Sequence, residues 1–291
     1  MLFAAFLEQG DTILAPGPHY PPYMAYPQMY GAKTVEYALD SDQGWDIDTD
    51  DIRRKMNDTV KFIVIVNPNN PTGNVAKPST IMEVLSIAKD WPNCTIIADE
   101  IYDALDFSGD QRSVASLSDE VPVVTLNGVS KVHFAPGWRI GYMAFFDPKR
   151  TLQAPRDGAE RILRSRLCAS TPAQYGYLAG LNHDRLWLKE RLRTIERRVD
   201  LCMNRIEGIE GLSCNKPGGA FYLFPKIDNP SKYGSDKKFV LDLLHEEHVL
   251  VVHGSGFSPR YGSGHFRLVA LAPEDLLNEA FDRIDRFVRS R

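Results

Sequence analysis

The sequence predicts an α/β fold, in which a large domain with a mostly parallel sheet precedes a smaller C-terminal α+β domain. Between Val60 and Leu126, short β-branched runs alternate with helical stretches, the pattern of right-handed crossovers between parallel strands. After a long amphipathic helix, the rest of the chain has the pattern of short strands and two helices. We therefore expect a large domain at residues 1–195 and a small domain at residues 196–291.

Composition and charge restrict the class of protein before any motif is considered. The 291 residues carry 34 Lys plus Arg against 38 Asp plus Glu, a formal net charge of −4, and 43% are hydrophobic. These values are typical of globular proteins and leave no basic face for nucleic acid. No apolar run reaches the roughly 18 residues that span a bilayer. The scattered cysteines and the absence of a signal-like N-terminus favour a cytoplasmic protein.

The first half of the chain supplies the strands of the predicted sheet. The opening MLFAAFL has helical spacing, ends at Gly10, and is followed by the strand-like TILA. Further strands are expected at VKFIVIV (60–66), TIIA (95–98), VPVVTL (121–126) and 140–146. Runs that are apolar on both faces predict a sheet that helices cover on both sides.

The second half supplies the long helix and the small domain. From about Asp184 to Glu207, apolar residues recur at spacings of three and four, which predicts one long helix. Strand-like segments follow at AFYLF, VLVV and HFRLVAL, and helices are expected around 236–247 and 274–289. The region from Gly211 to Gly219 is the only candidate linker.

Three of the predicted strands stop at polar residues, namely Asn67, Asp99 and Asn127. In open α/β sheets, ligands bind beyond the carboxyl ends of the strands, so we expect these residues to line one crevice. Lys131 shortly follows the last of these strands, and a neutral amine there could condense with an aldehyde. Asp99 could pair with a pyridinium nitrogen and keep the ring able to accept electrons. Taken singly, Lys131 is typical of a surface lysine and Asp99 of a strand-end turn.

Three further residues are candidates for contact with a planar ring. Tyr102 and Asn70 could donate hydrogen bonds to a ring oxygen, and Tyr20 could stack on the ring. Asn70 lies in a run of turn-forming residues that by default indicates a βα connection, and Tyr20 could equally be a core aromatic residue.

The remaining candidates would bind anions. Ser130 and Arg139 offer a hydroxyl and a guanidinium suited to a phosphate group. Arg267 lies in GHFRL, where polar and apolar residues alternate, and could hold a carboxylate through two hydrogen bonds. An arginine at a Gly-rich strand start, such as Arg139, is otherwise usually a surface residue.

Four ordered motifs resemble those of the fold type I pyridoxal-phosphate-dependent aminotransferases of classes I and II. They are NPNNPTG (67–73), ADEIY (98–102), SK followed by GWRIGY (130–142), and FRL (266–268). The segments RLCASTPAQ, KPGGAFYLFPKID and HGSGFSPRYGSGHFRLVAL look like bacterial and archaeal alanine aminotransferases. This resemblance covers essentially the whole chain. It implies the aspartate aminotransferase-like fold, pyridoxal 5'-phosphate as cofactor, and a homodimer.

The resemblance also implies a role for each candidate residue. Lys131 would bind the cofactor covalently and move a proton between the substrate Cα and the cofactor C4′. The other implied contacts are Asp99, Tyr102, Asn70 and Tyr20 to the ring, Ser130 and Arg139 to the phosphate, and Arg267 with Asn70 to the substrate carboxylate.

The implied reaction is transamination between an amino acid, alanine or glutamate, and a 2-oxo acid, pyruvate or 2-oxoglutarate. A C–S lyase, or an aspartate or aromatic aminotransferase, would use the same lysine, aspartate and arginine. Members of the family usually carry a further N-terminal segment with a helix N-terminus that binds the phosphate. An inactive truncated aminotransferase is therefore a second alternative.

Two alternative hypotheses, a dinucleotide-binding protein and a metal hydrolase, have weaker support in the sequence. VVHGSGFSP contains G-x-G after a strand, but Pro259 stands where a dinucleotide-binding fingerprint needs its third glycine. His245 and His248 lack the H-E-x-x-H spacing of a metal hydrolase and are expected on a helix surface.

Overall fold

The apolar runs of the first half form one seven-stranded sheet in the structure, a computed structural model that describes residues 1–184 and 186–291. Its strands are β1 (Thr12–Gly17), β2 (Lys33–Asp40), β3 (Asp46–Ile47), β4 (Val60–Val66), β5 (Thr95–Asp99), β6 (Val123–Gly128) and β7 (Gly141–Phe146). They lie in the order β3-β2-β1-β4-β5-β6-β7. The five central strands are parallel, and only β3 and β7 pair antiparallel. The predicted mostly parallel sheet is therefore confirmed.

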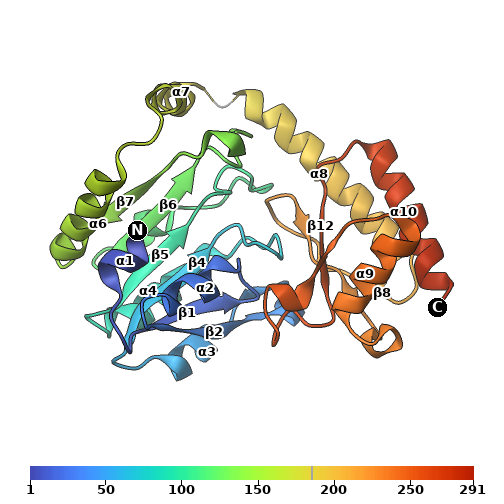
Figure 1. Cartoon of the computed structure of the whole chain (residues 1–291), viewed down its shortest axis with the longest axis horizontal. Coiled ribbons are helices and arrows are strands. Elements are labelled where there is room, and N and C mark those ends of the chain that lie inside the picture. Colours follow the sequence, from blue (N-terminus) through green and yellow to red (C-terminus); the bar gives the residue numbers. More distant parts are fainter. Residues whose placement is uncertain (185) are drawn as a thin grey trace.

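Helices cover both faces of this sheet, which explains why central strands such as β4 are apolar on both faces (Figure 1). Six of the seven residues of β4 are buried. Phe62 packs in the cluster that contains helix α1 (Leu2–Phe6), whereas the next residue, Ile63, packs in the cluster of α4 (Pro78–Lys89). The other helices of this lobe are α2 (Pro22–Gln28), α3 (Thr49–Lys55), α5 (Val114–Leu117), α6 (Gln153–Arg166) and α7 (Thr171–Asn182).

Helix α8 (Leu186–Glu207) leads from this lobe to a smaller C-terminal one (Figure 1). Its buried apolar stripe, which includes Ile195 and Val199, packs into the core of the smaller lobe. The sequence predicts this helix from about Asp184, and Arg185 lies outside the described residues. The expected domain boundary between residues 195 and 196 falls within α8.

The smaller lobe combines short strands with two helices. It contains β8 (Leu212–Ser213), β9 (Tyr222–Leu223), β10 (Lys226–Ile227), β11 (Val252–His253), β12 (Phe266–Val269), α9 (Asp236–Glu247) and α10 (Glu274–Arg289). Strands β11, β12 and β9 form one antiparallel sheet, and β10 pairs with β8. The bounds of α9 and α10 match the prediction, whereas the strands are shorter than the apolar runs that predict them.

One prediction fails in the stretch from Gly211 to Gly219, which does not separate the two lobes as a linker. The backbone N–H groups of Gly218 and Gly219 both donate to the carbonyl of Gly73, at 3.0 and 2.9 Å. Gly73 has a φ of +69°, and a Cβ there would lie 2.7 Å from the carbonyl oxygen of Tyr222. Only glycine fits this close contact, which joins the 67–73 turn to the smaller lobe.

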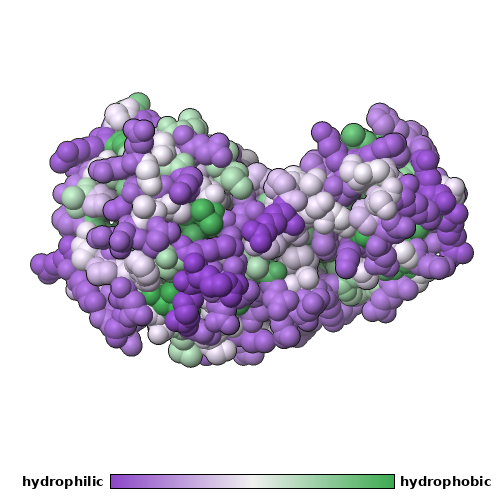
Figure 2. All heavy atoms as spheres, turned by 90° about the horizontal axis from the view of Figure 1, so that it is seen from below, coloured by the Kyte–Doolittle hydropathy of each residue, from purple (hydrophilic) through white to green (hydrophobic). Residues whose placement is uncertain are grey.

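The surface in Figure 2 is mostly hydrophilic, with hydrophobic side chains scattered over it and an indentation between the two lobes. Within the part of the chain that the structure describes, no helix is both long and apolar enough to cross a bilayer.

Candidate active site

The eight residues to which the resemblance assigns a role border a single cavity of about 390 Å³. They are Tyr20, Asn70, Asp99, Tyr102, Ser130, Lys131, Arg139 and Arg267. The larger lobe supplies all of them except Arg267, which comes from β12 of the smaller lobe. A cavity of this size is typical of a small-molecule site.

The strand ends contribute to the cavity much as the sequence predicts, with one exception. Asp99 and Asn127, at the ends of β5 and β6, border it. Asn67 does not, because it is buried and its Oδ1 accepts a hydrogen bond of 3.0 Å from the N–H of Ala76. That bond shapes the turn after β4, and Asn70, three residues later, reaches the cavity instead.

Asp99 is held by Tyr23, a residue of α2 that the sequence analysis does not single out. The Tyr23 hydroxyl donates a hydrogen bond of 2.7 Å to Oδ2 of Asp99, and the N–H of Ile101 lies 3.4 Å from Oδ1. Burial raises the pKa of Asp99 above its ordinary value, while the two hydrogen bonds and the nearby ammonium group of Lys131 oppose this increase. Asp99 is thus a desolvated carboxyl group whose ionised form has specific partners.

Lys131 lies in the loop that follows β6, partly buried among aromatic side chains. Its Nζ is 5.8 Å from the ring centroids of both Tyr102 and Phe221. Burial raises the pKa of Tyr102 well above its ordinary value, so this phenol stays protonated at neutral pH. The hydroxyl of Tyr102 is 2.9 Å from that of Tyr222.

Arg267 joins the smaller lobe to the turn that carries Asn70. Its Nη1 donates a hydrogen bond of 2.7 Å to Oδ1 of Asn70, a residue 197 positions away in the chain. The guanidinium carbon lies 4.6 Å from the ring centroid of Tyr222 and 4.7 Å from that of Phe257. Its Nε is buried and has no hydrogen-bond partner among the described residues. Arg267 therefore has an N–H group left to donate to a ligand.

The other predicted residues are more accessible. Tyr20 is 46% exposed, and its ring lies edge-on to Tyr23 with centroids 6.4 Å apart. Ser130 is partly buried beside Lys131. Arg139 is exposed, has a φ of +52°, and donates from Nη1 to the carbonyl of Pro136 at 2.8 Å. A non-glycine residue with positive φ is uncommon, and here it ends the short helical turn at Pro136–Trp138.

Sequence reasoning misses two residues of the site, Tyr23 and Tyr222. Tyr23 does not border the cavity and acts only on Asp99, and its position three residues after Tyr20 in HYPPY is the only sequence signal. Tyr222 lies in a two-residue strand, too short for any periodicity to show which side chain faces the cavity.

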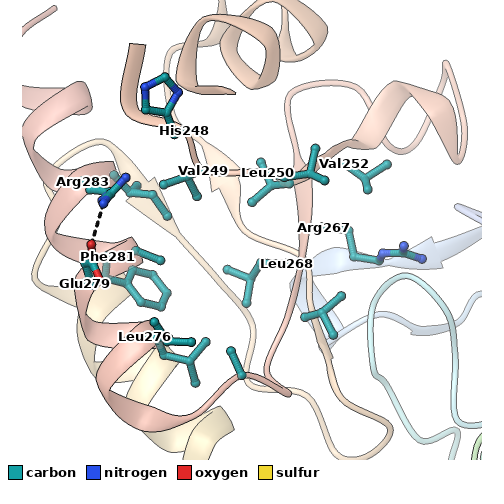
Figure 3. Close-up of a pocket in the computed structure, with 16 residues that line it drawn as sticks. His248, Val249, Leu250, Val252, Arg267, Leu268, Leu276, Glu279, Phe281 and Arg283 are labelled. Atoms are coloured by element: carbon teal, nitrogen blue, oxygen red, sulfur yellow. Dashed lines mark hydrogen bonds and ion pairs between the residues drawn. The ribbon is translucent and has the colours of Figure 1, made fainter. Parts of the chain in front are cut away.

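A larger cavity, of about 600 Å³, lies in the smaller lobe beside α10 (Figure 3). Its lining is mainly aliphatic, and two of its charged residues, Glu279 and Arg283, pair with each other. In Figure 3 the guanidinium of Arg267 points away from α10. Lys131, the buried carboxyl group of Asp99 and the guanidinium of Arg267 thus meet at the cavity of about 390 Å³, which is the candidate active site.

Comparison with known proteins identifies the family of this chain. The family "Aminotransferase class I and II" matches residues 1–284. The glutamate-pyruvate aminotransferase AlaA of Haemophilus influenzae is 39% identical over 99% of this chain and 72% of its own length. The alanine aminotransferase structure from Pyrococcus furiosus has a TM-score of 0.96 and 47% identity, covering all of this chain and 73% of that one.

A more distant structure has the same fold. The aspartate aminotransferase of Thermus thermophilus with maleate has a TM-score of 0.88 and 28% identity, over 98% of this chain and 72% of that one. The fold is thus that of the aspartate aminotransferase-like transferases, as the sequence predicts. The chain belongs to the class I and II aminotransferases, which are pyridoxal-phosphate-dependent enzymes.

Proposed function

We propose that this aminotransferase exchanges an amino group between alanine or glutamate and pyruvate or 2-oxoglutarate. The convergence of Lys131, Asp99 and Arg267 on one cavity carries the proposal. Alanine and glutamate are favoured because the relatives named for those substrates match nearly the whole chain at 39% and 47% identity.

The residues around the cavity fit pyridoxal phosphate. They offer a carboxylate for the pyridine nitrogen, phenol and amide groups for the ring oxygen, and a hydroxyl and a guanidinium for the phosphate. The buried Nε of Arg267 has no hydrogen-bond partner among the described residues, and such a donor suits an anionic ligand. When bound, pyridoxal phosphate supplies an aldehyde for the substrate amine and a ring that accepts electrons released at Cα.

In this proposal Asp99 binds the pyridine nitrogen and keeps its proton in place. Desolvation strengthens the attraction between the carboxylate and a positive ring nitrogen, and Tyr23 fixes the direction of the carboxylate through its hydrogen bond of 2.7 Å. Tyr102 and Asn70 would contact the ring oxygen, and Tyr20 would stack on the ring.

Lys131 and Arg267 act on the substrate. Lys131 would hold the cofactor covalently, and its Nζ would move a proton between the substrate Cα and the cofactor C4′. Arg267 binds the α-carboxylate and so orients the Cα–H bond, with Asn70 holding the guanidinium at 2.7 Å. Ser130 and Arg139 would bind the cofactor phosphate.

We also propose that the enzyme is a homodimer. Large apolar side chains are exposed on and beside α7, where Tyr175 is 71%, Leu178 53% and Trp138 50% exposed. A cluster of this kind is typical of a protein interface. Sedimentation velocity would test it, and a monomer at micromolar concentration would contradict it.

The first experiment is a titration of the purified chain with pyridoxal phosphate, followed by absorption. We expect a saturable band that Lys131→Ala abolishes and that Lys237→Ala, a change of an exposed lysine on α9, leaves intact. A chain without any Lys131-dependent band would contradict the proposal and favour the inactive alternative.

Product analysis then separates the reactions. Transfer from alanine to 2-oxoglutarate is expected. Release of pyruvate and ammonia from a cysteine conjugate would identify a C–S lyase, and faster transfer from aspartate or an aromatic amino acid would identify the other aminotransferases.

A further inference from the structure

Tyr222 contacts two different parts of the active site with two different parts of its side chain. It lies on β9, is 4% exposed and borders the cavity. Its hydroxyl is 2.9 Å from the hydroxyl of Tyr102, and its ring lies 4.6 Å from the guanidinium carbon of Arg267. It is therefore the link between the residue proposed for the cofactor ring oxygen and the residue proposed for the substrate carboxylate.

The ring of Tyr222 restricts the orientation of Arg267. Phe257 also packs against the guanidinium, at 4.7 Å, and Nη1 is bound to Asn70. A planar guanidinium that is stacked on aromatic rings and fixed at one nitrogen has little freedom to rotate. The orientation of its remaining N–H groups, including the buried Nε, is thus fixed before a substrate carboxylate binds.

The hydroxyl of Tyr222 affects Tyr102 through a single proton. A phenol has one proton to donate, so Tyr102 can serve a ring oxygen only if it does not donate to Tyr222. The guanidinium beside the Tyr222 ring draws electron density from it and makes its O–H the better donor of the two. A donor that itself accepts a hydrogen bond is strengthened by cooperativity.

We propose that Tyr222 is a positioning residue with two separable roles, because its hydroxyl donates to Tyr102 and directs the Tyr102 proton to the cofactor ring oxygen, while its ring fixes Arg267. The inference rests on the proposed function. The two roles depend on different atoms, so two substitutions at this one position can separate them.

The test uses the full chain loaded with pyridoxal phosphate and three variants. Tyr222→Phe removes the hydroxyl and keeps the ring, and Tyr222→Leu removes both. Tyr37→Phe is the matched control, because Tyr37 is also buried and loses a hydrogen bond of 2.7 Å, to the carbonyl of Val64, away from the cavity. Two quantities are measured: the pKa of the Lys131-dependent absorption band without substrate, and the KM for the amino acid.

Tyr222→Phe is expected to raise the pKa of the band by about 0.2 to 0.7 unit, because Tyr102 becomes a weaker donor to the ring oxygen. The KM should stay within about twofold of the wild-type value, since the stacked ring remains. Tyr222→Leu should shift the band similarly and also raise the KM by about 2- to 30-fold. Tyr37→Phe should change neither quantity.

The hydroxyl role is overturned if Tyr222→Phe leaves the pKa of the band unchanged or lowers it, since a decrease would mean that Tyr102 donates to Tyr222. The ring role is overturned if Tyr222→Leu leaves the KM unchanged or if Tyr222→Phe raises it equally. Either result would be seen in a protein that still forms the Lys131-dependent band. Failure of the proposed function would instead remove that band from the wild-type chain.

Discussion

The hydroxyl of Tyr23 donates a hydrogen bond of 2.7 Å to Oδ2 of Asp99, although 76 positions separate the two residues. Helix α2 and the end of β5 meet at this bond. Burial alone would favour the neutral form of Asp99, whereas the bond from Tyr23 favours the carboxylate. Tyr23 thus supports the charge that a pyridinium nitrogen requires, without bordering the cavity itself.

Tyr23→Phe should weaken the binding of pyridoxal phosphate by about tenfold, the effect of one hydrogen bond to a charged group. The loss should be larger at pH 6 than at pH 8, because the pKa of Asp99 increases without Tyr23 and the carboxylate is then protonated more readily. Titration at the two pH values measures this. Tyr26→Phe changes a 53% exposed tyrosine of the same helix and should bind normally. Equal affinities for wild type and Tyr23→Phe would show that the bond is unimportant.

Arg267→Gln should raise the KM for the amino acid by about 100-fold or more, because two charge-assisted hydrogen bonds to the carboxylate are lost. Steady-state kinetics with alanine as donor provides the measurement. The control is Arg260→Gln, since Arg260 also packs on an aromatic ring, at 5.0 Å from that of Tyr261, but lies outside the cavity. An unchanged KM in Arg267→Gln would place the carboxylate elsewhere.

A pair of glycines tests the contact between the 67–73 turn and the smaller lobe. Gly73 and Gly44 have φ angles of +69° and +70°, but only a Cβ at Gly73 would meet other atoms, the nearest being the Cβ of Pro217 at 2.5 Å. Both alanine variants should lose about 1 kcal/mol of unfolding free energy through backbone strain, and Gly73→Ala about 2 kcal/mol more. Urea unfolding measures the difference. Equal losses would mean that the turn can move away from the smaller lobe.

Glu100, the neighbour of Asp99 in the sequence, predicts a pH dependence of stability. Burial raises its pKa from 4.5 to about 6, although the N–H of Val114 donates to it at 2.8 Å. The native state then binds this proton more tightly than the unfolded state, so ionisation of Glu100 lowers stability as the pH rises from about 4.5 to about 6. Glu100→Gln should remove that decrease.

The Glu100→Gln variant should therefore be more stable than wild type at pH 7, by about 2 kcal/mol, and no more stable at pH 4. Thermal or urea unfolding at the two pH values provides the measurement. A stability difference that does not change with pH would contradict the assignment.

The sequence predicts most of the larger lobe because its strands are long and doubly covered. The seven-residue run of β4 has six buried residues, so its composition alone distinguishes it from a surface segment. The ends of such strands also predict where Asp99 and Lys131 lie. Strand β2 is not predicted, since only two of its eight residues are fully buried and its composition is mixed.

The sequence predicts less where long-range contacts determine the structure. Asn67 has the same position at a strand end as Asp99, but its side chain accepts a hydrogen bond from the N–H of Ala76 and lies in the protein interior instead of the cavity. Tyr222 reaches Tyr102 across 120 positions, a contact that no local pattern encodes. The motifs predict the residue types that the chemistry needs. The residues that orient those side chains, such as Tyr222, depend on contacts between distant parts of the chain, which a motif does not predict.

The bond between Asn70 and Arg267 has a consequence for the order in which the site forms. The two residues are 197 positions apart, so the part of the cavity proposed to bind the substrate carboxylate depends on a highly non-local contact. During synthesis the N-terminal lobe, with Asp99 and Lys131, emerges from the ribosome well before Arg267. The residues proposed to hold the cofactor are therefore made first, and the residue proposed to bind the substrate carboxylate joins the cavity only when β12 has folded.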